Sequence, residues 1–288
     1  MKAMLTDITK CVGCNKCKEA CYNLNNKGKV AHTCKDAKDD LSEMNWADIV
    51  LYDQGRLYVD GRDYPDCPTQ ITDKNVKDHP SAGYVRKHCL HCLEPTCVAV
   101  CPVGAFHKDA ETGAVVYDSD KCIGCRYCMY ACPFSIPRYE WGTPFPVVQK
   151  CILCFDKIKQ GEQPACTAAC PEQATIFGDR DELIVEAHHR IKNNPQQYLN
   201  HVYGETEAGG TSVLYLTKPG VPLDFIGFNK NLGTQSLPTQ THKWLTKVPP
   251  IGVGAAVSFS GLFWIIKRRN ELTNGEENGE GGNTNAQE

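Results

Sequence analysis

The chain has 288 residues, of which 41% are hydrophobic and 23% charged, and its mean hydropathy is −0.40. These values exclude a protein with many membrane spans and a wholly disordered chain. The formal net charge is −3, and residues 270–288 contain five Glu but no Lys or Arg, so residues 1–269 sum to +2. A nearly neutral chain before this tail gives no electrostatic basis for binding nucleic acid, and we expect no such partner.

Cysteine is unusually frequent, at 18 of 288 residues. This density is below that of small disulfide scaffolds, and a chain of this length does not need disulfides in order to fold. Sixteen of the cysteines form four runs that each open C-x-x-C and close C-x-x-x-C, which makes the runs an internal repeat. In chain order the runs are Cys11, Cys14, Cys17 and Cys21; Cys89, Cys92, Cys97 and Cys101; Cys122, Cys125, Cys128 and Cys132; and Cys151, Cys154, Cys166 and Cys170.

The spacing within the runs predicts four [4Fe–4S] clusters. Three thiolates so spaced converge on one cubane, and in two-cluster ferredoxins the fourth ligand comes from the end of the other run. Proline follows the last cysteine of three runs, as Pro102, Pro133 and Pro171. Sixteen cysteines fill four such sites with none left over. Zinc and disulfides are the alternatives, but zinc knuckles lack this closure, and three cysteines within seven residues would strain most disulfide pairings.

If the fourth cysteines are exchanged between runs, the gaps between runs predict which runs form pairs. Runs two and three are only about twenty residues apart and should form one module, which leaves runs one and four to form the other. The expected iron ligands are Cys11, Cys14 and Cys17 with Cys170; Cys151, Cys154 and Cys166 with Cys21; Cys89, Cys92 and Cys97 with Cys132; and Cys122, Cys125 and Cys128 with Cys101.

The expected fold class is α+β, with two bacterial-ferredoxin-like dicluster modules that contain insertions and one C-terminal transmembrane helix. The expected boundaries are residues 1–26 and 140–180 for the module of runs one and four, 27–84 for an insertion, 85–139 for the module of runs two and three, 181–247 for a helix and extended C-terminal extension, 248–268 for the transmembrane helix and 269–288 for a disordered acidic tail.

Local patterns predict several elements inside these domains. Alternating residues around a Gly-bearing turn predict hairpins over 105–117 and 57–62, and residues 173–178 are expected to form a strand. Apolar residues at helical spacing predict one amphipathic helix over 181–192, and the Gly, Pro and Thr content of 203–247 indicates extended chain.

Residues 248–266 contain no charged side chain and are followed by Lys267, Arg268 and Arg269. At 1.5 Å per residue, nineteen residues reach roughly the thickness of a bilayer core. We therefore expect this segment to contact the lipid bilayer; the alternative is a buried helix of a soluble domain. The basic residues after the segment outnumber Lys243 and Lys247 before it, which favours a cytoplasmic C-terminus and a periplasmic cluster domain.

No arrangement of residues for organic substrate chemistry is apparent, and we expect no catalytic residue in this chain. His91, inside the second C-x-x-C, is a candidate for a hydrogen bond near a cluster, and Arg126 and Arg138 are candidates for offsetting cluster charge. Cys34 and Cys67 lie outside the runs and either pair in an oxidising compartment or remain buried thiols.

The four runs, in this order and with the long gap in the fourth, resemble the iron–sulfur subunits of membrane-bound respiratory oxidoreductases. Within that group, residues 121–133 and 203–215 resemble the hydrogenase-2-type subunit and the beta subunit of formate dehydrogenase N. In the nitrate reductase pattern, a tryptophan replaces one cysteine of the fourth run. Run four of this chain keeps all four cysteines, so the resemblance implies four cubanes. Tyr22 replaces the usual proline after run one, a departure that bears on the shape of that loop but not on ligation. We expect no export signal at the N-terminus, and this favours the formate dehydrogenase arrangement, in which a catalytic partner carries the signal.

The resemblance implies a non-catalytic electron-transfer subunit in the cytoplasmic membrane. Its expected partners are a catalytic subunit, either a molybdopterin or tungstopterin formate dehydrogenase or a [NiFe] hydrogenase, and an integral membrane subunit that reacts with quinone. Two other functions remain open: a subunit of a molybdopterin reductase that takes electrons from quinol, and a free-standing polyferredoxin. A membrane helix argues against the polyferredoxin, because a diffusing carrier gains nothing from an anchor.

Overall fold

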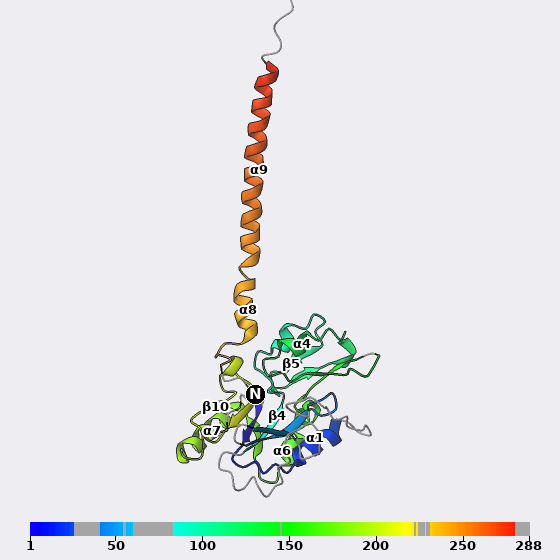
Figure 1. Ribbon diagram of the computed structural model, residues 1–288, viewed down its shortest axis with the longest axis vertical. Coiled ribbons are helices and arrows are strands. Elements are labelled where there is room, and N and C mark those ends of the chain that lie inside the picture. Colours follow the sequence, from blue (N-terminus) through cyan, green and yellow to red (C-terminus); the bar gives the residue numbers. More distant parts are fainter. Residues whose placement is uncertain are drawn as a thin grey trace, which may run out of the picture. The chain divides into compact units, whose positions relative to one another are not determined.

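The computed structural model describes residues 1–25, 41–53, 56–59, 83–144, 146–221, 223, 228 and 231–279, with the side chains of 51–53, 56–59 and 273–279 excepted. The chain divides into two units, which we call the body (residues 1–238) and the C-terminal unit (residues 239–288). All sixteen cysteines of the four runs belong to the body, whose elements are labelled in Figure 1. Cys34 and Cys67 lie outside the described residues.

The central sheet of the body joins the two ends of its chain. Its strand order is β10 (Val202–Tyr203), β11 (Val213–Leu216), β1 (Lys2–Asp7) and β9 (Thr175–Asp179). β1 runs parallel to β11 and antiparallel to β9, and Thr6 pairs with Thr175. Run one starts four residues after β1 and run four ends five residues before β9. The antiparallel pairing therefore brings the start of run one and the end of run four to the same edge of the sheet.

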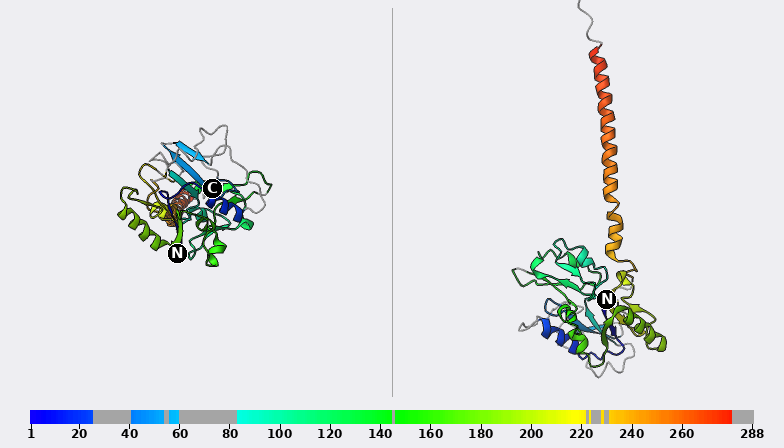
Figure 2. Two further views of the ribbon diagram at one scale, coloured as in Figure 1. Left: turned by 90° about the horizontal axis from the view of Figure 1, so that it is seen from below. Right: turned by 180° about the vertical axis from the view of Figure 1, so that it is seen from behind.

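Helix α7 (Arg180–Asn193) covers one face of this sheet and confirms the helix expected over 181–192. Its Leu183, Ala187 and Ile191 are buried at a spacing of four residues. They pack in one core cluster with Ala3, Leu5, Leu214 and Leu216 of the sheet. In both figures α7 lies on the flank of the body opposite α1 (Lys16–Asn25) (Figures 1 and 2).

A second sheet is formed by residues of the expected insertion together with the strand that follows it. Its order is β3 (Arg56–Val59), β2 (Ala47–Asp53) and β4 (Gly83–His88). β3 contains the first three residues of the hairpin expected over 57–62, and the other three lie outside the described residues. Because β4 ends one residue before Cys89, this sheet determines where run two begins.

The chain around runs two and three forms small elements. The hairpin expected between these runs is confirmed, with Phe106 paired to Tyr117. The turn needs Gly113, because its φ is +71° and a Cβ there would lie 2.2 Å from the Lys2 carbonyl oxygen. The elements are α3 (Thr96–Ala99), β5 (Phe106–Lys108), β6 (Val115–Tyr117), η1 (Ser119–Lys121), α4 (Tyr127–Ala131), β7 (Arg138–Tyr139) and β8 (Val148–Gln149).

Short helices that carry cysteines pack in two pairs. α1 contacts α6 (Ala165–Ala168), and α3 contacts α4. Run four also contains α5 (Phe155–Lys159). The helix pairs join run one to run four and run two to run three, as expected for two dicluster modules.

The strand expected over 173–178 is confirmed by β9, but the expectation of extended chain over 203–247 holds only in part. β10, η2 (Glu207–Gly209) and β11 are extended or turn-like, whereas residues Leu237–Leu245 form helix α8. Pro238 occupies the first turn of that helix, where proline is favoured, and no glycine follows within it.

The C-terminal unit contains α9 (Val248–Gly279). Residues Leu237–Leu272 include a helix long and apolar enough to cross a membrane, judged by length and composition. Its apolar side chains are exposed, including Phe259, Phe263 and Ile265. The helix extends beyond the expected end at residue 268, where Glu271 lies within ion-pair distance of Lys267 and Arg268. Residues 280–288 lie outside the described residues.

Candidate metal centres

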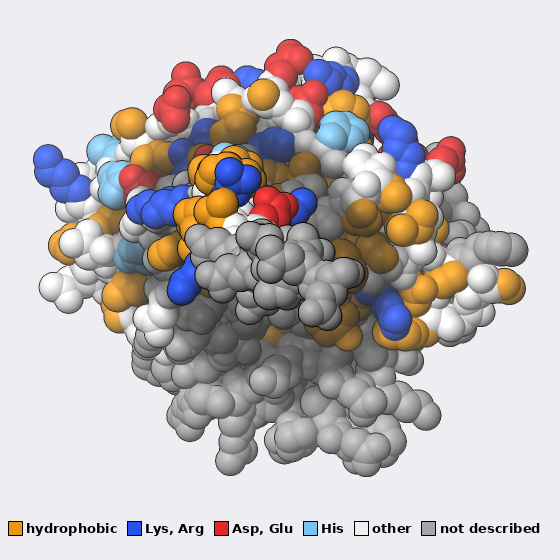
Figure 3. Space-filling model, turned by 90° about the horizontal axis from the view of Figure 1, so that it is seen from above, with side chains coloured by type: hydrophobic (Ala, Val, Ile, Leu, Met, Phe, Trp, Pro, Cys, Tyr) orange, Lys and Arg blue, Asp and Glu red, His pale blue; other side chains and the backbone are white. Residues whose placement is uncertain are grey.

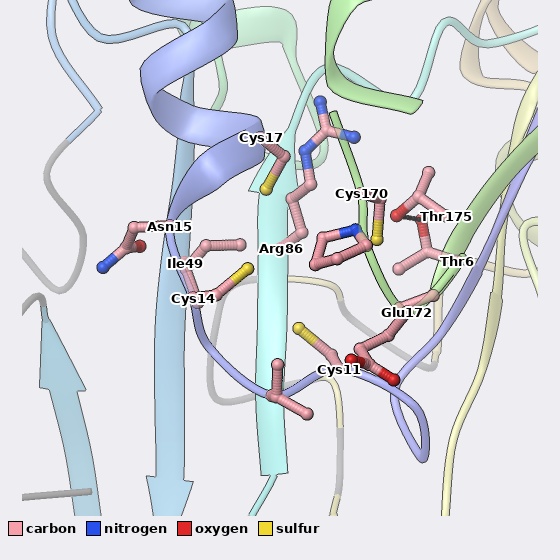
Figure 4. Close-up of a pocket in the computed structure, with 13 residues that line it drawn as sticks. Thr6, Cys11, Cys14, Asn15, Cys17, Ile49, Arg86, Cys170, Glu172 and Thr175 are labelled. Atoms are coloured by element: carbon pink, nitrogen blue, oxygen red, sulfur yellow. Dashed lines mark hydrogen bonds between the residues drawn. The ribbon is translucent and has the colours of Figure 1, made fainter. Parts of the chain in front are cut away.

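The sixteen cysteines of the four runs gather in four places in the body, which we call sites I to IV. Three of the sites are cavities with about 410, 310 and 360 Å³ of empty space, part of which is open to solvent. Site I is lined by Cys11, Cys14, Cys17 and Cys170, site II by Cys21, Cys151, Cys154 and Cys166, and site III by Cys89, Cys92, Cys97 and Cys132. These are the groupings that the exchange of fourth cysteines predicts. Figure 4 shows the cysteines of site I around one cavity.

Site IV is defined by the electrostatic neighbours of Cys128. Burial raises the pKa of the Cys128 thiol to about 12, and the charges of Cys122, Cys125 and Cys101 act in the same direction. Cys128 and Cys101 also belong to the same packed cluster of side chains. The fourth predicted set of cysteines is therefore close together as well.

In all four C-x-x-C loops, the third residue adopts a left-handed backbone conformation. The φ values are +69° at Gly13, +51° at His91, +70° at Gly124 and +60° at Leu153. This conformation turns backbone N–H groups back toward the first cysteine of the loop. The N–H of Gly124 donates to Cys122 Sγ at 3.4 Å, and that of Leu153 donates to Cys151 Sγ at 3.4 Å. Such hydrogen bonds stabilise negative charge on the sulfur.

Burial raises the pKa of several of these thiols, so the folded chain alone does not favour their thiolate forms. The pKa of Cys11, of Cys21 and of Cys97 is raised to about 12 in this way. Metal ligation requires the thiolate, and binding of a metal releases the proton. Four thiols around one cavity, several of them with a raised pKa, fit a positively charged metal–sulfide core, because such a core supplies the charge that burial otherwise opposes.

Two buried cations that the spacing of the cysteines does not reveal lie at these sites. Arg86 on β4 lines both site I and site II. Lys150, which directly precedes Cys151, lines site III, and its Nζ donates to the carbonyl oxygens of Val115 and Cys151. Arg86 lies three residues before Cys89 and Lys150 directly before Cys151, and this closeness to a cysteine run is the signal in the sequence that could have pointed to them.

The three residues proposed from the sequence as cluster neighbours have other contacts. Arg126 lies over the rings of Tyr139 and Trp141, at 5.4 and 5.2 Å from their centroids. Arg138 donates to the carbonyl oxygens of Leu41, Ser135 and Ile136. His91 is fully buried, and its Nδ1 accepts a hydrogen bond from a backbone N–H of β6 at 2.9 Å. None of the three lines the cavity of site I, II or III.

Shared or neighbouring residues link each of the four sites to the next. Arg86 lines sites I and II together. Cys89 of site III is an electrostatic neighbour of Cys151 of site II, and Cys97 of site III packs in one cluster with Cys101 and Cys128 of site IV. The order is therefore I, II, III, IV.

The two end sites are closer to solvent than the two inner sites. The residue that follows the first cysteine is 53% exposed in site I, as Val12, and 65% exposed in site IV, as Ile123. At the same position Leu90 of site III is 1% exposed and Ile152 of site II is half-buried. On the face that Figure 3 shows, acidic, basic and apolar side chains are interspersed, so no single sign of charge dominates there.

Two stretches of the chain match family models for a 4Fe-4S dicluster domain, over residues 10–105 and 81–180. Two dicluster domains account for four [4Fe–4S] clusters, which confirms the predicted cofactor and the ferredoxin-like fold class. The assignment of individual cysteines as iron ligands is a proposal that rests on sites I to IV.

The chain is also similar to three proteins from oxidoreductase systems, of which two are named as subunits and one as an operon protein. It is 33% identical over 311 residues to the hydrogenase-2 operon protein HybA of Escherichia coli O157:H7, covering 96% of this chain and 87% of the relative. It is 30% identical over 271 residues to the nitrate-inducible formate dehydrogenase iron-sulfur subunit of Escherichia coli strain K12, with coverages of 91% and 83%. It is 37% identical over 177 residues to the B subunit of the anaerobic dimethyl sulfoxide reductase of that strain, with coverages of 62% and 73%.

Proposed function

This chain belongs to the family of [4Fe–4S] dicluster iron–sulfur subunits of oxidoreductases, and on that premise we propose that it relays electrons singly between a catalytic subunit and a quinone-reactive membrane subunit. The subunit itself is non-catalytic. Sites I to IV would each hold one [4Fe–4S] cluster, which supplies the one-electron chemistry. The protein determines the order, spacing and potential of the clusters.

The observation that carries this proposal is the succession of adjoining sites from I to IV, with an exposed residue in the first loop of each end site. A relay needs one site near the surface to accept electrons, another near the surface to release them, and shielded sites between the two. The residue after the first cysteine is exposed in sites I and IV, whereas it is half-buried in site II and buried in site III. We therefore assign sites I and IV to the exchange of electrons with the two partners. A store of electrons without partners would not need two exposed ends.

A formate-oxidising or an H₂-oxidising subunit is the catalytic partner that the relatives support. The formate dehydrogenase subunit and the hydrogenase-2 operon protein both match more than nine tenths of this chain. The hydrogenase-2 relative has the higher identity and coverage, and it supports a [NiFe] partner. A molybdopterin reductase is the third candidate, supported by the shorter match to the dimethyl sulfoxide reductase subunit.

Purification of the intact complex, followed by metal analysis, tests the partner. Molybdenum or tungsten with a large second subunit identifies a formate dehydrogenase or a relative, and nickel identifies a hydrogenase. Isolation of the chain as a stable, fully loaded protein with no partner would contradict the relay and favour the polyferredoxin.

Iron content and double variants test the ligand assignment. Four cubanes require about 16 iron per chain, after correction for partner metals. Cys14→Ser combined with Cys170→Ser removes two ligands of site I alone, so three clusters should remain, with about 12 iron. The matched variant Cys14→Ser with Cys21→Ser damages sites I and II, so about 8 iron should remain. The reverse result would mean that each run closes on its own last cysteine.

We also propose that α9 anchors the chain in the cytoplasmic membrane, with the body in the periplasm. Lys267, Arg268 and Arg269 after the apolar segment outnumber Lys243 and Lys247 before it, and positive residues favour the cytoplasmic side. Protease added to intact spheroplasts should digest the body. Loss of only the last twenty or so residues would place the body in the cytoplasm.

A further inference from the structure

Arg86 is a buried charge that lies between two of the sites. The residue is 2% exposed, and it lines the cavities of both site I and site II. Its side chain extends from β4 toward Cys17 and Cys170 (Figure 4). The cysteines nearest to its guanidinium come from both sites: Cys17 from site I, and Cys21, Cys151 and Cys166 from site II.

Two nitrogen atoms of this guanidinium lack a protein partner. Nε and Nη1 are buried and donate to no acceptor in the described part of the chain. An ion in the protein interior is strongly disfavoured unless an opposite charge and hydrogen-bond acceptors compensate it. Within the described ranges no carboxylate forms an ion pair with Arg86. The compensation must come from something that the cavities hold.

The charges that surround Arg86 are those of sulfur. The nearest groups that can carry the opposite charge are the thiolates of Cys166, Cys17, Cys151 and Cys21. Two of these thiolates, those of Cys17 and Cys166, belong to different sites. A guanidinium suits this position because its N–H groups point in several directions at once and it keeps its charge at all physiological pH values.

We propose that Arg86 is a positioning residue shared by two clusters, donating N–H groups to sulfur atoms at sites I and II and raising the reduction potentials of both clusters. The proposal rests on the proposed function, because it requires clusters at these sites. By charge counting, a cubane with four thiolates carries about −2 when oxidised and about −3 when reduced. A fixed positive charge stabilises the reduced form more, so the potential rises.

Lys150, the other buried cation, differs from Arg86 in its hydrogen-bond partners. Its Nζ is satisfied by two backbone carbonyl oxygens, at 2.5 and 2.9 Å. Arg86, by contrast, keeps N–H groups that only the contents of the cavities can satisfy. Of these two buried cations, Arg86 is therefore the one with buried nitrogen atoms that have no hydrogen-bond partner among the described residues.

A redox titration of the intact complex, followed by electron paramagnetic resonance, tests the proposal. In Arg86→Gln two of the four cluster potentials should fall, each by at least a tenfold change in the reduction equilibrium, about 59 mV for one electron. The other two should hold. Arg86→Lys keeps the charge and should leave the same two potentials nearer to their original values. Arg190→Gln is the matched control, because Arg190 pairs with Asp7 and Glu186 and lines none of the three cavities, so it should shift nothing.

Unchanged potentials in Arg86→Gln with four clusters present would overturn the proposal, as would an equal shift of all four. If Arg86→Gln loses the clusters of sites I and II while Arg86→Lys keeps four clusters, the result supports the proposal that these two clusters need a positive charge at residue 86. Loss of clusters from both variants counts against it, because the proposal requires only a positive donor. Absence of clusters from the unaltered chain would instead refute the proposed function.

Discussion

At the scale of single residues, the backbone of the C-x-x-C loops determines where the sulfurs lie. Gly13 and Gly124 occupy the left-handed position that His91 and Leu153 occupy in the other two loops. A side chain is therefore tolerated at this φ in some loops. At Gly13 the space is limited as well, because a Cβ would lie 2.4 Å from Cε1 of Tyr84.

We predict that Gly13→Ala destabilises the body and reduces the occupancy of site I. The left-handed conformation alone costs about 1–2 kcal/mol for a residue with a Cβ, and the collision with the Tyr84 ring adds to that cost. Denaturant unfolding and iron content measure the effect. Gly104→Ala is the control, since Gly104 has φ +62° but a Cβ added there would meet no other atom within 4 Å. Equal losses in both variants would show that the ring contact is unimportant.

At the scale of elements, one buried ion pair ties α1 to the second sheet. Lys18 Nζ lies 2.9 Å from Asp48 Oδ1, and the two side chains are 8% and 0% exposed. Lys18 follows Cys17 of site I, and Asp48 precedes Ile49, which lines the same site. The pair therefore connects a residue of the insertion to the helix that begins in run one.

Asp48→Asn should cost roughly 3–5 kcal/mol of stability, because a buried lysine loses its opposite charge. Thermal and denaturant unfolding of the full chain would measure it. Glu162→Gln is the matched control, since the Lys157–Glu162 pair is exposed and such pairs contribute about 0–1 kcal/mol. A loss below about 1 kcal/mol in Asp48→Asn, no larger than that of an exposed pair, would mean that the buried pair is not important for stability.

Helix α7 offers a second test at this scale. Leu183→Ala removes a buried side chain from the core between α7 and the central sheet, and we expect a loss of about 2–5 kcal/mol. Val185→Ala on the same helix, at a position 69% exposed, should change stability by less than about 0.5 kcal/mol. Similar effects in the two variants, measured by denaturant unfolding, would contradict the packing of α7 on the sheet.

At the scale of the whole molecule, the cysteine sites and the apolar helix belong to different units. All sixteen cysteines of the runs lie in residues 1–238, and α9 lies in residues 239–288. Removal of residues 248–288 should therefore leave about 16 iron per chain while the protein no longer partitions into detergent. Phase separation and an iron assay, with the full chain as control, measure both properties. Loss of iron from the truncated chain would mean that the apolar segment supports the clusters.

The type and number of clusters could be predicted from the sequence, because cluster ligation depends on cysteine spacings within short loops. The hairpin over 105–117 and the helix over 181–192 were predictable for the same reason. The residues that indicate each of them lie within about a dozen positions of one another in the chain. Helix α8 was not predicted, because residues 203–247 as a whole are rich in Gly, Pro and Thr, and this composition is typical of extended chain.

What only the tertiary structure decided depends on contacts between distant segments. The place of β1 between β9 and β11 depends on strands more than 160 residues away in the chain. The position of Arg86 depends on β4 passing between runs one and four, although Arg86 precedes run two in sequence. Spacing determined which sulfurs could share a cluster, whereas the packing of the two modules determined their order and the cation between sites I and II, because long-range pairing leaves no local pattern.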